Sequence, residues 1–186
     1  MSKRVWIAGI VSAAIAGAAF AAAPAGAAAP PPPKLGRPAT AEDIAKIDIS
    51  IPPDGKGLPA GSGSVAQGAA VFAQKCSVCH GANAEGTPSG DRLVGGVGSL
   101  ASPNPLKTVT SYWPYATTVF DYIRRAMPIT NPQSLQNDEV YAVVAFILSR
   151  DNVVPMDAVL DAQSLPKVQM PNKAGFVNWE PRLIKP

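Results

Sequence analysis

The chain has 186 residues, with 16 basic and 13 acidic side chains and a formal net charge of +3. That length allows one ordinary domain with additional segments at its ends. The near balance of charge argues against the basic surface typical of a nucleic-acid binder and against a strongly acidic disordered chain. We therefore expect no nucleic-acid partner.

The N-terminus has the three parts of a secretory signal peptide. Two basic residues are followed by an apolar run over residues 5–23 and by a small-residue cleavage site at Ala25-Gly26-Ala27. We predict a signal peptide over residues 1–27. The alternative is an uncleaved membrane anchor, because the apolar run is close to the length that spans a bilayer. Both interpretations place the rest of the chain outside the cytoplasmic membrane, so we predict a periplasmic location.

Residues 28–61 are rich in proline, with four prolines in a row at 30–33. Such a stretch is extended and semi-rigid, and it lacks the apolar content for a core. We predict an extended arm. The arm is either a spacer or, through Ile44, Ile47 and Ile51, a segment that lies along a partner or along the domain surface.

A first helix is expected directly before the two cysteines of the chain. Ser64 is a plausible N-cap, and Val65, Gly68, Val71 and Phe72 follow at helical spacing. Glycine in a helix interior costs stability, so Gly68 hints that another helix crosses closely there. The plainer interpretation, which we adopt, is a helix whose apolar face packs on the core.

The segment Cys76-Ser77-Val78-Cys79-His80 carries the chemistry of the chain. Two cysteines separated by two residues and followed at once by a histidine form the attachment signature of a c-type haem. Cys76 and Cys79 each form a thioether with one haem vinyl group, and His80 becomes the proximal ligand of the iron. Because the sequence has no other cysteine or histidine, we expect one covalent haem c, whose second iron ligand is not histidine.

Two other uses of a CxxC pair are weaker. A structural zinc site takes four protein ligands, whereas the cysteines and the histidine of this chain supply three. A redox-active disulfide of the thioredoxin type belongs to a strand–turn–helix context, which the residues around the motif do not predict. The redox disulfide stays open as the alternative.

Residues 81–100 are rich in glycine and lack periodicity, so we expect a loop around the haem edge. A metal-bound histidine almost always donates its second ring N–H to an oxygen. We expect this acceptor in the same loop, with Pro88 or a neighbouring carbonyl as the candidate.

An aromatic cluster at residues 112–115 precedes a second helix, which we expect over residues 116–126. Buried tyrosine and tryptophan need a partner for their polar atom, and haem propionates are suitable acceptors. Trp113 and Tyr115 are therefore candidate propionate contacts, with ordinary core packing as the alternative.

Arg124 and Arg125 lie at the end of this second helix. A guanidinium group binds the carboxylate of a propionate or of a partner protein. Because adjacent helical residues do not share a face, we expect at most one of the two to touch haem and the other to face solvent or a partner.

Met127 follows the second helix and precedes Pro128, which stops the helix. A thioether sulfur is a soft, neutral ligand for haem iron, and His/Met ligation raises the reduction potential. Met127 is the predicted second iron ligand. Met170 is the alternative, and an iron with an open position is the third option.

A third helix is expected over residues 137–149, where apolar side chains recur at the spacing of a buried face. We expect it to pack against the helix that contains Gly68. Residues 151–186 carry five prolines and scattered apolar residues. We expect this tail to lie extended over the domain or over another subunit.

With these three helices around CSVCH and Met127-Pro128, residues 62–150 resemble class I cytochrome c. The run from Leu135 to Val143 is similar to the terminal helix of that family, with Gln136 in place of the usual serine cap. The resemblance implies an all-α class I cytochrome c fold around one covalent haem, with extended N- and C-terminal arms.

A narrower resemblance covers nearly the whole mature chain and rests on the runs at residues 107–109, 111–118, 120–128, 165–168 and 170–172. In these runs the chain is similar to the cytochrome subunits of bacterial molybdenum-dependent sulfur dehydrogenases. The best match is the SoxD type of sulfane dehydrogenase, with the sulfite dehydrogenase subunit as a near relative. Some members of the sulfane dehydrogenase group carry two haems, whereas this chain has a site for one.

This resemblance implies a periplasmic electron-transfer subunit that has no catalytic centre of its own. It would accept electrons from a molybdopterin-containing subunit that oxidises sulfane sulfur or sulfite, and pass them to another c-type cytochrome. Two functions of other classes stay open. A free-standing carrier to a terminal oxidase should not need such long tails, and a haem enzyme or gas sensor needs an open iron position.

Overall fold

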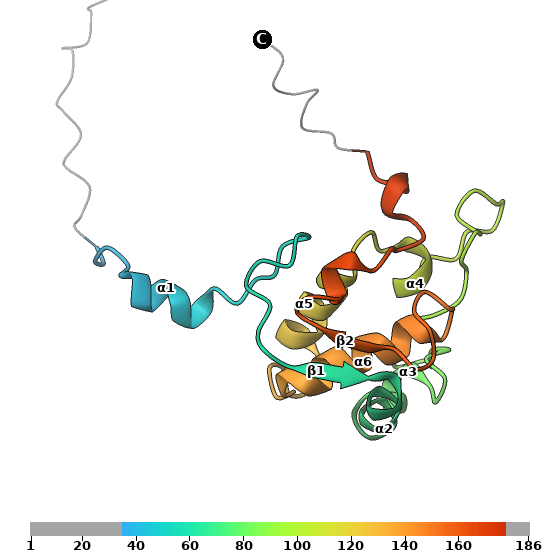
Figure 1. The fold of residues 1–186 in the computed structure, drawn as a ribbon, viewed down its shortest axis with the longest axis horizontal. Coiled ribbons are helices and arrows are strands. Elements are labelled where there is room, and N and C mark those ends of the chain that lie inside the picture. The colour runs from blue at the N-terminus through green and yellow to red at the C-terminus, as the bar shows by residue number, and fades with distance from the viewer. Residues whose placement is uncertain (1–34, 178–186) are drawn as a thin grey trace, which may run out of the picture. The chain divides into compact units, whose positions relative to one another are not determined.

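The computed structural model describes residues 35–177 (Figure 1). The predicted signal peptide and the end of the predicted tail lie outside these residues. No helix within residues 35–177 is long and apolar enough to cross a membrane. The described residues from 39 onward belong to one compact unit, which holds all the elements that follow.

The unit is helical apart from one small sheet. The three predicted helices are α2 (Val65–Lys75), α5 (Ala116–Ala126) and α6 (Asn137–Ser149). Shorter helical segments, which the sequence did not predict, are α1 (Ala41–Ile47), α3 (Ser77–His80), α4 (Val109–Tyr112), η1 (Leu165–Lys167) and η2 (Lys173–Gly175). The sheet pairs β1 (Ser62–Ser64) antiparallel with β2 (Val159–Asp161).

The long helices begin where local capping signals place them. The Ser64 hydroxyl accepts the Gln67 N–H at 3.2 Å, and the Gln67 side chain accepts the Ser64 N–H at 2.8 Å, so a reciprocal capping box starts α2. At the start of α6 the Glu139 carboxylate accepts the Gln136 N–H at 2.9 Å. The glutamine in place of serine therefore does not displace the start of the helix.

Helix α2 packs against α6 at a position where only a glycine fits. A Cβ on Gly68 would lie 2.5 Å from the Ala142 carbonyl carbon and 2.8 Å from the Phe146 Cβ, closer than real atoms approach. Gly63 in β1 meets the same residue, because its Cβ would lie 2.5 Å from the Ala142 Cα. The expected packing of α6 against the helix of Gly68 is confirmed, and the crossing is closer than the core-facing helix we adopted requires. One turn further along, the rings of Phe72 and Phe146 pack with centroids 5.0 Å apart.

The proline-rich arm contributes to the core, which its composition did not suggest. The Ile51 side chain is 5% exposed and belongs to the core cluster. The Tyr141 hydroxyl of α6 donates to the Pro59 carbonyl oxygen at 2.9 Å. Of the two roles open to the arm, lying along the domain surface is therefore confirmed for this part of it. Ile44 and Ile47, on α1, are exposed.

The C-terminal tail also packs into the unit. Strand β2 places Leu160 opposite Gly63, and Leu160, Leu165 and Met170 are all buried. Further along, the Asn172 side chain donates to the Tyr112 carbonyl oxygen at 2.9 Å. The expectation that the tail lies over the domain is confirmed. Residues that precede and follow the predicted domain (62–150) in the sequence therefore belong to its core.

We expect Gly68→Ala to lower the free energy of unfolding by about 1–3 kcal/mol, because the new methyl group meets the backbone of α6. The gain in helix propensity, about 1 kcal/mol, opposes this loss but is smaller than the clash. Denaturant-induced unfolding measures the change. Ala66→Ser adds one atom on an exposed position of the same helix and should change stability by less than about 0.5 kcal/mol. An unchanged or raised stability in Gly68→Ala would contradict the close crossing.

We expect Leu165→Ala to lower the free energy of unfolding by about 2–5 kcal/mol, since the side chain is fully buried. Thermal and denaturant unfolding measure this loss. Met156→Ala is the matched control in the same tail, because Met156 is 61% exposed and its truncation should be nearly neutral. Equal effects of the two substitutions would show that the tail does not complete the core.

Candidate haem site

The CxxCH motif continues directly from the end of α2. The Cys76 N–H closes the last turn of α2 on the Phe72 carbonyl oxygen at 2.9 Å. The N–H groups of Cys79 and His80 then both donate to the Cys76 carbonyl oxygen, at 3.1 and 3.0 Å. Because these bonds form one tight helical turn, α3, both cysteines and the histidine are held on a single short piece of rigid backbone.

One hydrogen bond orients the His80 ring. Its Nδ1 lies 2.7 Å from the Asp91 carbonyl oxygen, and because a carbonyl oxygen only accepts, Nδ1 carries the proton. The other ring nitrogen, Nε2, then keeps a free lone pair for a metal. The acceptor lies in the predicted loop, and it is the carbonyl oxygen of Asp91, three residues after Pro88, rather than that of Pro88 itself. The sequence does not mark which of several carbonyl oxygens the loop brings to the ring.

The loop after the motif binds the motif's own backbone. The Gly86 N–H donates to the His80 carbonyl oxygen at 2.7 Å, and the Thr87 hydroxyl donates to the Cys79 carbonyl oxygen at 2.5 Å. A Cβ on Gly90 would lie 2.7 Å from the Cys79 carbonyl oxygen, so a glycine is needed where the loop crosses back. The loop therefore fixes the turn that carries His80.

The second part of the loop is held by Asp151, just after α6. Its carboxylate accepts the Gly95 N–H and the Thr110 hydroxyl. The Thr108 hydroxyl donates to the Gly95 carbonyl oxygen at 2.7 Å. Sequence reasoning missed Asp151 because no local pattern connects it to residues more than 40 positions earlier.

Both cysteines are free and partly buried. Burial raises the pKa of the Cys76 thiol to about 11, with Lys75 acting in the opposite direction. A redox-active CxxC pair of the thioredoxin type has a lowered thiol pKa instead. This difference speaks against the redox-disulfide alternative.

The zinc alternative finds no support either. Among residues 35–177 no group of three or more His, Cys, Asp and Glu side chains could hold a metal ion. Two free thiols on one turn, next to an imidazole whose Nδ1 is occupied and whose Nε2 is available, are the donor set that a c-type haem uses. Cys76, Cys79 and His80 therefore fit covalent haem.

Met127 caps the C-terminus of α5. Its N–H donates to the Ile123 carbonyl oxygen at 3.0 Å, and its side chain is partly buried against the core. Met170, the alternative ligand, is 3% exposed inside the core, and Met156 is exposed in the tail. Because Met170 is enclosed in the core, Met127 is the better candidate for the iron ligand. Its role as ligand stays a prediction.

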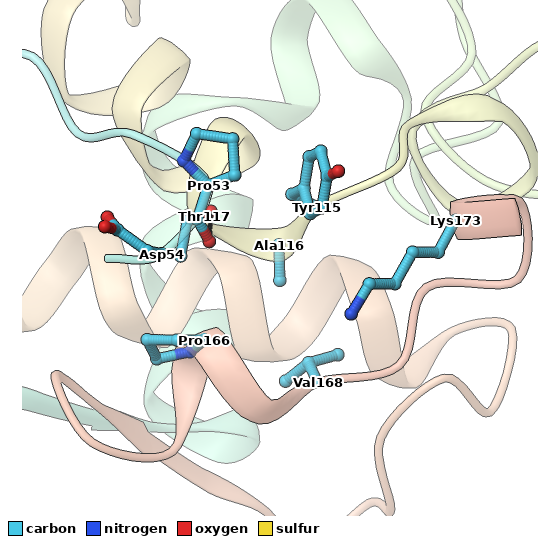
Figure 2. Close-up of a pocket in the computed structure, with 8 residues that line it drawn as sticks. All are labelled: Pro53, Asp54, Tyr115, Ala116, Thr117, Pro166, Val168 and Lys173. Carbon is cyan, nitrogen blue, oxygen red and sulfur yellow. Dashed lines mark hydrogen bonds between the residues drawn. The ribbon is translucent and has the colours of Figure 1, made fainter. Parts of the chain in front are cut away.

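The two candidate propionate contacts have different surroundings. The Trp113 ring packs edge-on against Tyr122, with centroids 5.6 Å apart. Tyr115 lines a pocket of about 310 Å³ with Lys173, whose Nζ lies 6.0 Å from the centroid of the Tyr115 ring (Figure 2). Both contacts stay predictions. The pocket is formed by the arm, the start of α5 and the tail through Pro53, Asp54, Tyr115, Ala116, Thr117, Pro166, Val168 and Lys173.

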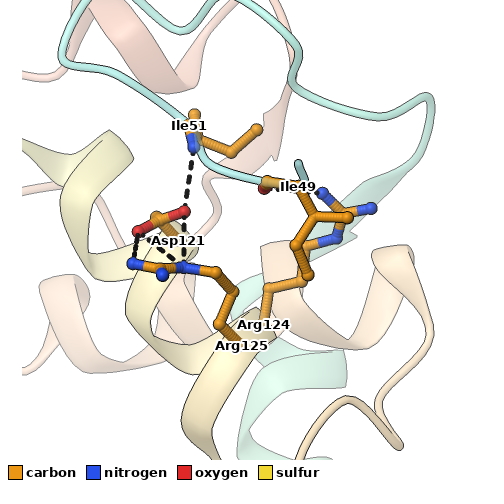
Figure 3. Close-up of polar contacts among 5 residues, drawn as sticks. All are labelled: Ile49, Ile51, Asp121, Arg124 and Arg125. Atoms are coloured by element: carbon orange, nitrogen blue, oxygen red, sulfur yellow. Dashed lines mark hydrogen bonds and ion pairs between the residues drawn. The ribbon is translucent and has the colours of Figure 1, made fainter. Parts of the chain in front are cut away.

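The two arginines at the end of α5 bind groups of the chain itself (Figure 3). Arg125 forms a fork with Asp121, with Nη2 2.5 Å from Oδ2 and Nε 3.0 Å from Oδ1. Arg124 donates to the Ile49 carbonyl oxygen at 3.3 Å. Asp121 also accepts the Ile51 N–H at 2.9 Å. Sequence reasoning missed Asp121, although its i, i+4 spacing to Arg125 is a recognised helix pair.

Comparison with known proteins agrees with this site. A family model for cytochrome c matches residues 65–151. The crystal structure of the sulfane dehydrogenase SoxCD from Paracoccus pantotrophus contains a similar chain, 44% identical, with a TM-score of 0.72 over 82% of this chain and 78% of that one. A search of curated proteins gave no match.

These findings confirm the predicted fold. The similarity to the SoxCD structure extends well beyond the region that the family model matches, and the described elements are helical apart from the β1–β2 pair. Family and site together imply a covalently bound haem c. The chain therefore belongs to the class I c-type cytochromes and resembles the SoxD-type cytochrome of sulfane dehydrogenase.

Proposed function

We propose that this chain is the periplasmic monohaem electron-transfer subunit of a molybdenum-dependent sulfur-compound dehydrogenase. The observation that carries the proposal is the CxxCH turn with its oriented histidine, in a chain 44% identical to one in the sulfane dehydrogenase SoxCD. Its partners are a molybdopterin-containing subunit, which oxidises sulfane sulfur or sulfite, and a downstream c-type cytochrome.

Each residue of the motif has a separate task. Cys76 and Cys79 would hold the haem covalently, and His80 would offer Nε2 to the iron. The hydrogen bond from His80 to the Asp91 carbonyl oxygen fixes the orientation of the ring and raises the basicity of Nε2. Met127 would supply a thioether sulfur as a further ligand. When bound, the haem supplies a reversible one-electron change at its iron.

The long tails no longer distinguish a subunit from a free carrier. Residues 49–60 of the arm and residues 154–172 of the tail contact their own domain, so they are not available as free docking arms. Support for a subunit comes instead from the similarity to SoxCD, which is itself a dehydrogenase.

We expect Met127→Ala to keep covalent haem, because both cysteines remain, and to lower the reduction potential, because a thioether ligand is lost. The reduced variant should also bind carbon monoxide. Pyridine haemochrome spectra, redox titration and carbon monoxide difference spectra measure these effects. Met170→Ala is the control, since it removes a buried core sulfur and should lower stability without changing the potential. A parent-like spectrum and potential in Met127→Ala would exclude Met127 as the ligand.

We expect the tagged, haem-loaded chain to co-purify with a molybdenum protein from its own periplasm. Metal analysis should find molybdenum with the haem iron, and a sulfur substrate added without oxygen should reduce the haem. A Cys76→Ser, Cys79→Ser variant, which cannot form the thioethers, is the control for the haem signal and should show no reduction of a covalent haem. Purification of the chain alone would favour a free carrier, and carbon monoxide binding to the unaltered protein would favour a haem enzyme or sensor.

A further inference from the structure

Three polar side chains on one face of α5 bind the backbone of the arm. They are Thr117, Asp121 and Arg124, which lie at i, i+4 and i+7 and so share a face of the helix. Their partners are alternate residues of the arm, namely the Pro53 carbonyl oxygen at 3.1 Å, the Ile51 N–H at 2.9 Å and the Ile49 carbonyl oxygen at 3.3 Å. We call residues 49–53 the strap.

The spacing of the strap matches the helix beneath it. Two residues of extended chain cover about 6.6 Å, and one helical turn rises about 5.4 Å. A segment running antiparallel to α5 therefore meets a new side chain of the helix at every second residue. The arm thus lies along α5 in register rather than touching it at one point.

Asp121 is the central contact of the strap. Its carboxylate is nearly buried, and burying a charge is costly unless the charge is paired. The Ile51 N–H and the Arg125 fork supply those partners, and no buried side-chain polar atom of the described residues lacks one. The Ile51 side chain inserts into the core, so it keeps the N–H in place over the carboxylate.

The same carboxylate stiffens the last turn of α5. Arg125 binds Asp121 across that turn with two nitrogens (Figure 3). Met127 belongs to the same turn, because its N–H closes on the Ile123 carbonyl oxygen at 3.0 Å. Any displacement of the turn therefore displaces the backbone that carries the Met127 sulfur.

We propose that the strap, acting through Asp121 and Arg125, positions Met127 as the second ligand of the haem iron. The proposal rests on the proposed function in one respect, that Met127 ligates the iron. Asp121 and Arg125 are positioning residues, since they act through the last turn of α5. A loosened strap lets the sulfur leave the iron more often, so that an added ligand competes better for that position.

The test is an imidazole titration of the ferric, haem-loaded, full-length protein. In Asp121→Asn the affinity for imidazole should rise roughly tenfold, the effect of losing about one charge-assisted hydrogen bond, and the reduction potential should fall. Arg125→Lys keeps the charge but loses the fork, so its affinity should lie between those of the parent and Asp121→Asn.

Thr117→Val, on the same face of α5, is the matched control. It removes the bond to the Pro53 carbonyl oxygen, ten residues before Met127, and leaves the Asp121–Arg125 pair intact. It should lower the free energy of unfolding without changing imidazole affinity. Ile51→Ala is the second variant if Asp121→Asn does not fold, because it loosens the strap while every side chain of α5 stays in place. Its imidazole affinity should also rise.

The outcomes distinguish two claims, namely that the strap positions Met127 and that Met127 is the iron ligand. If Met127→Ala binds imidazole more tightly while Asp121→Asn and Ile51→Ala match Thr117→Val, the strap has no positioning role and the ligand assignment stands. If Met127→Ala also leaves imidazole affinity unchanged, Met127 is not the ligand and the strap proposal is overturned with it. Co-purification with a molybdenum protein is independent of both results.

Discussion

The contact of α2 with α6 is the constraint on which the rest of the structure depends. Gly68 has no side chain, so the backbone of α2 rests directly on Ala142. Because Cys76 ends α2 and the CxxCH turn follows at once, the position of this crossing sets where the thiols and the His80 ring lie. The Asp91 carbonyl oxygen occupies Nδ1 and so leaves Nε2 as the ring nitrogen available to a metal. The position of the motif thus depends on a packing contact that lies two helical turns earlier.

Sequence reasoning succeeded where one local signal decided the structure. The three long helices follow from apolar periodicity, the Ser64 cap and the proline after Met127, and all three have the predicted limits. It failed where structure depends on partners far along the chain. Strands of three residues carry too little periodicity to detect, and the β1–β2 pair joins residues nearly a hundred positions apart. The arm looked unable to form a core because Ile51, the one buried side chain among its described residues 35–61, carries no pattern.

The site was predictable in its chemistry but not in its supporting contacts. The motif names Cys76, Cys79 and His80 because haem attachment needs those residue types at that spacing. It does not identify Asp91, because any carbonyl oxygen of the loop could have met the ring. Asp121 and Arg125 form a visible helix pair, yet the third partner, the Ile51 N–H, is a backbone group that no sequence pattern marks.

The burial of Leu160 and Leu165 has a consequence for assembly of the protein. Synthesis proceeds from the N-terminus, so the CxxCH motif is complete some eighty residues before the segment that closes the core. During that interval the helices lack part of their apolar cover, and the two thiols stand on a chain that has not yet finished folding. The core of the unit is therefore complete only after the tail has been made, long after the motif itself.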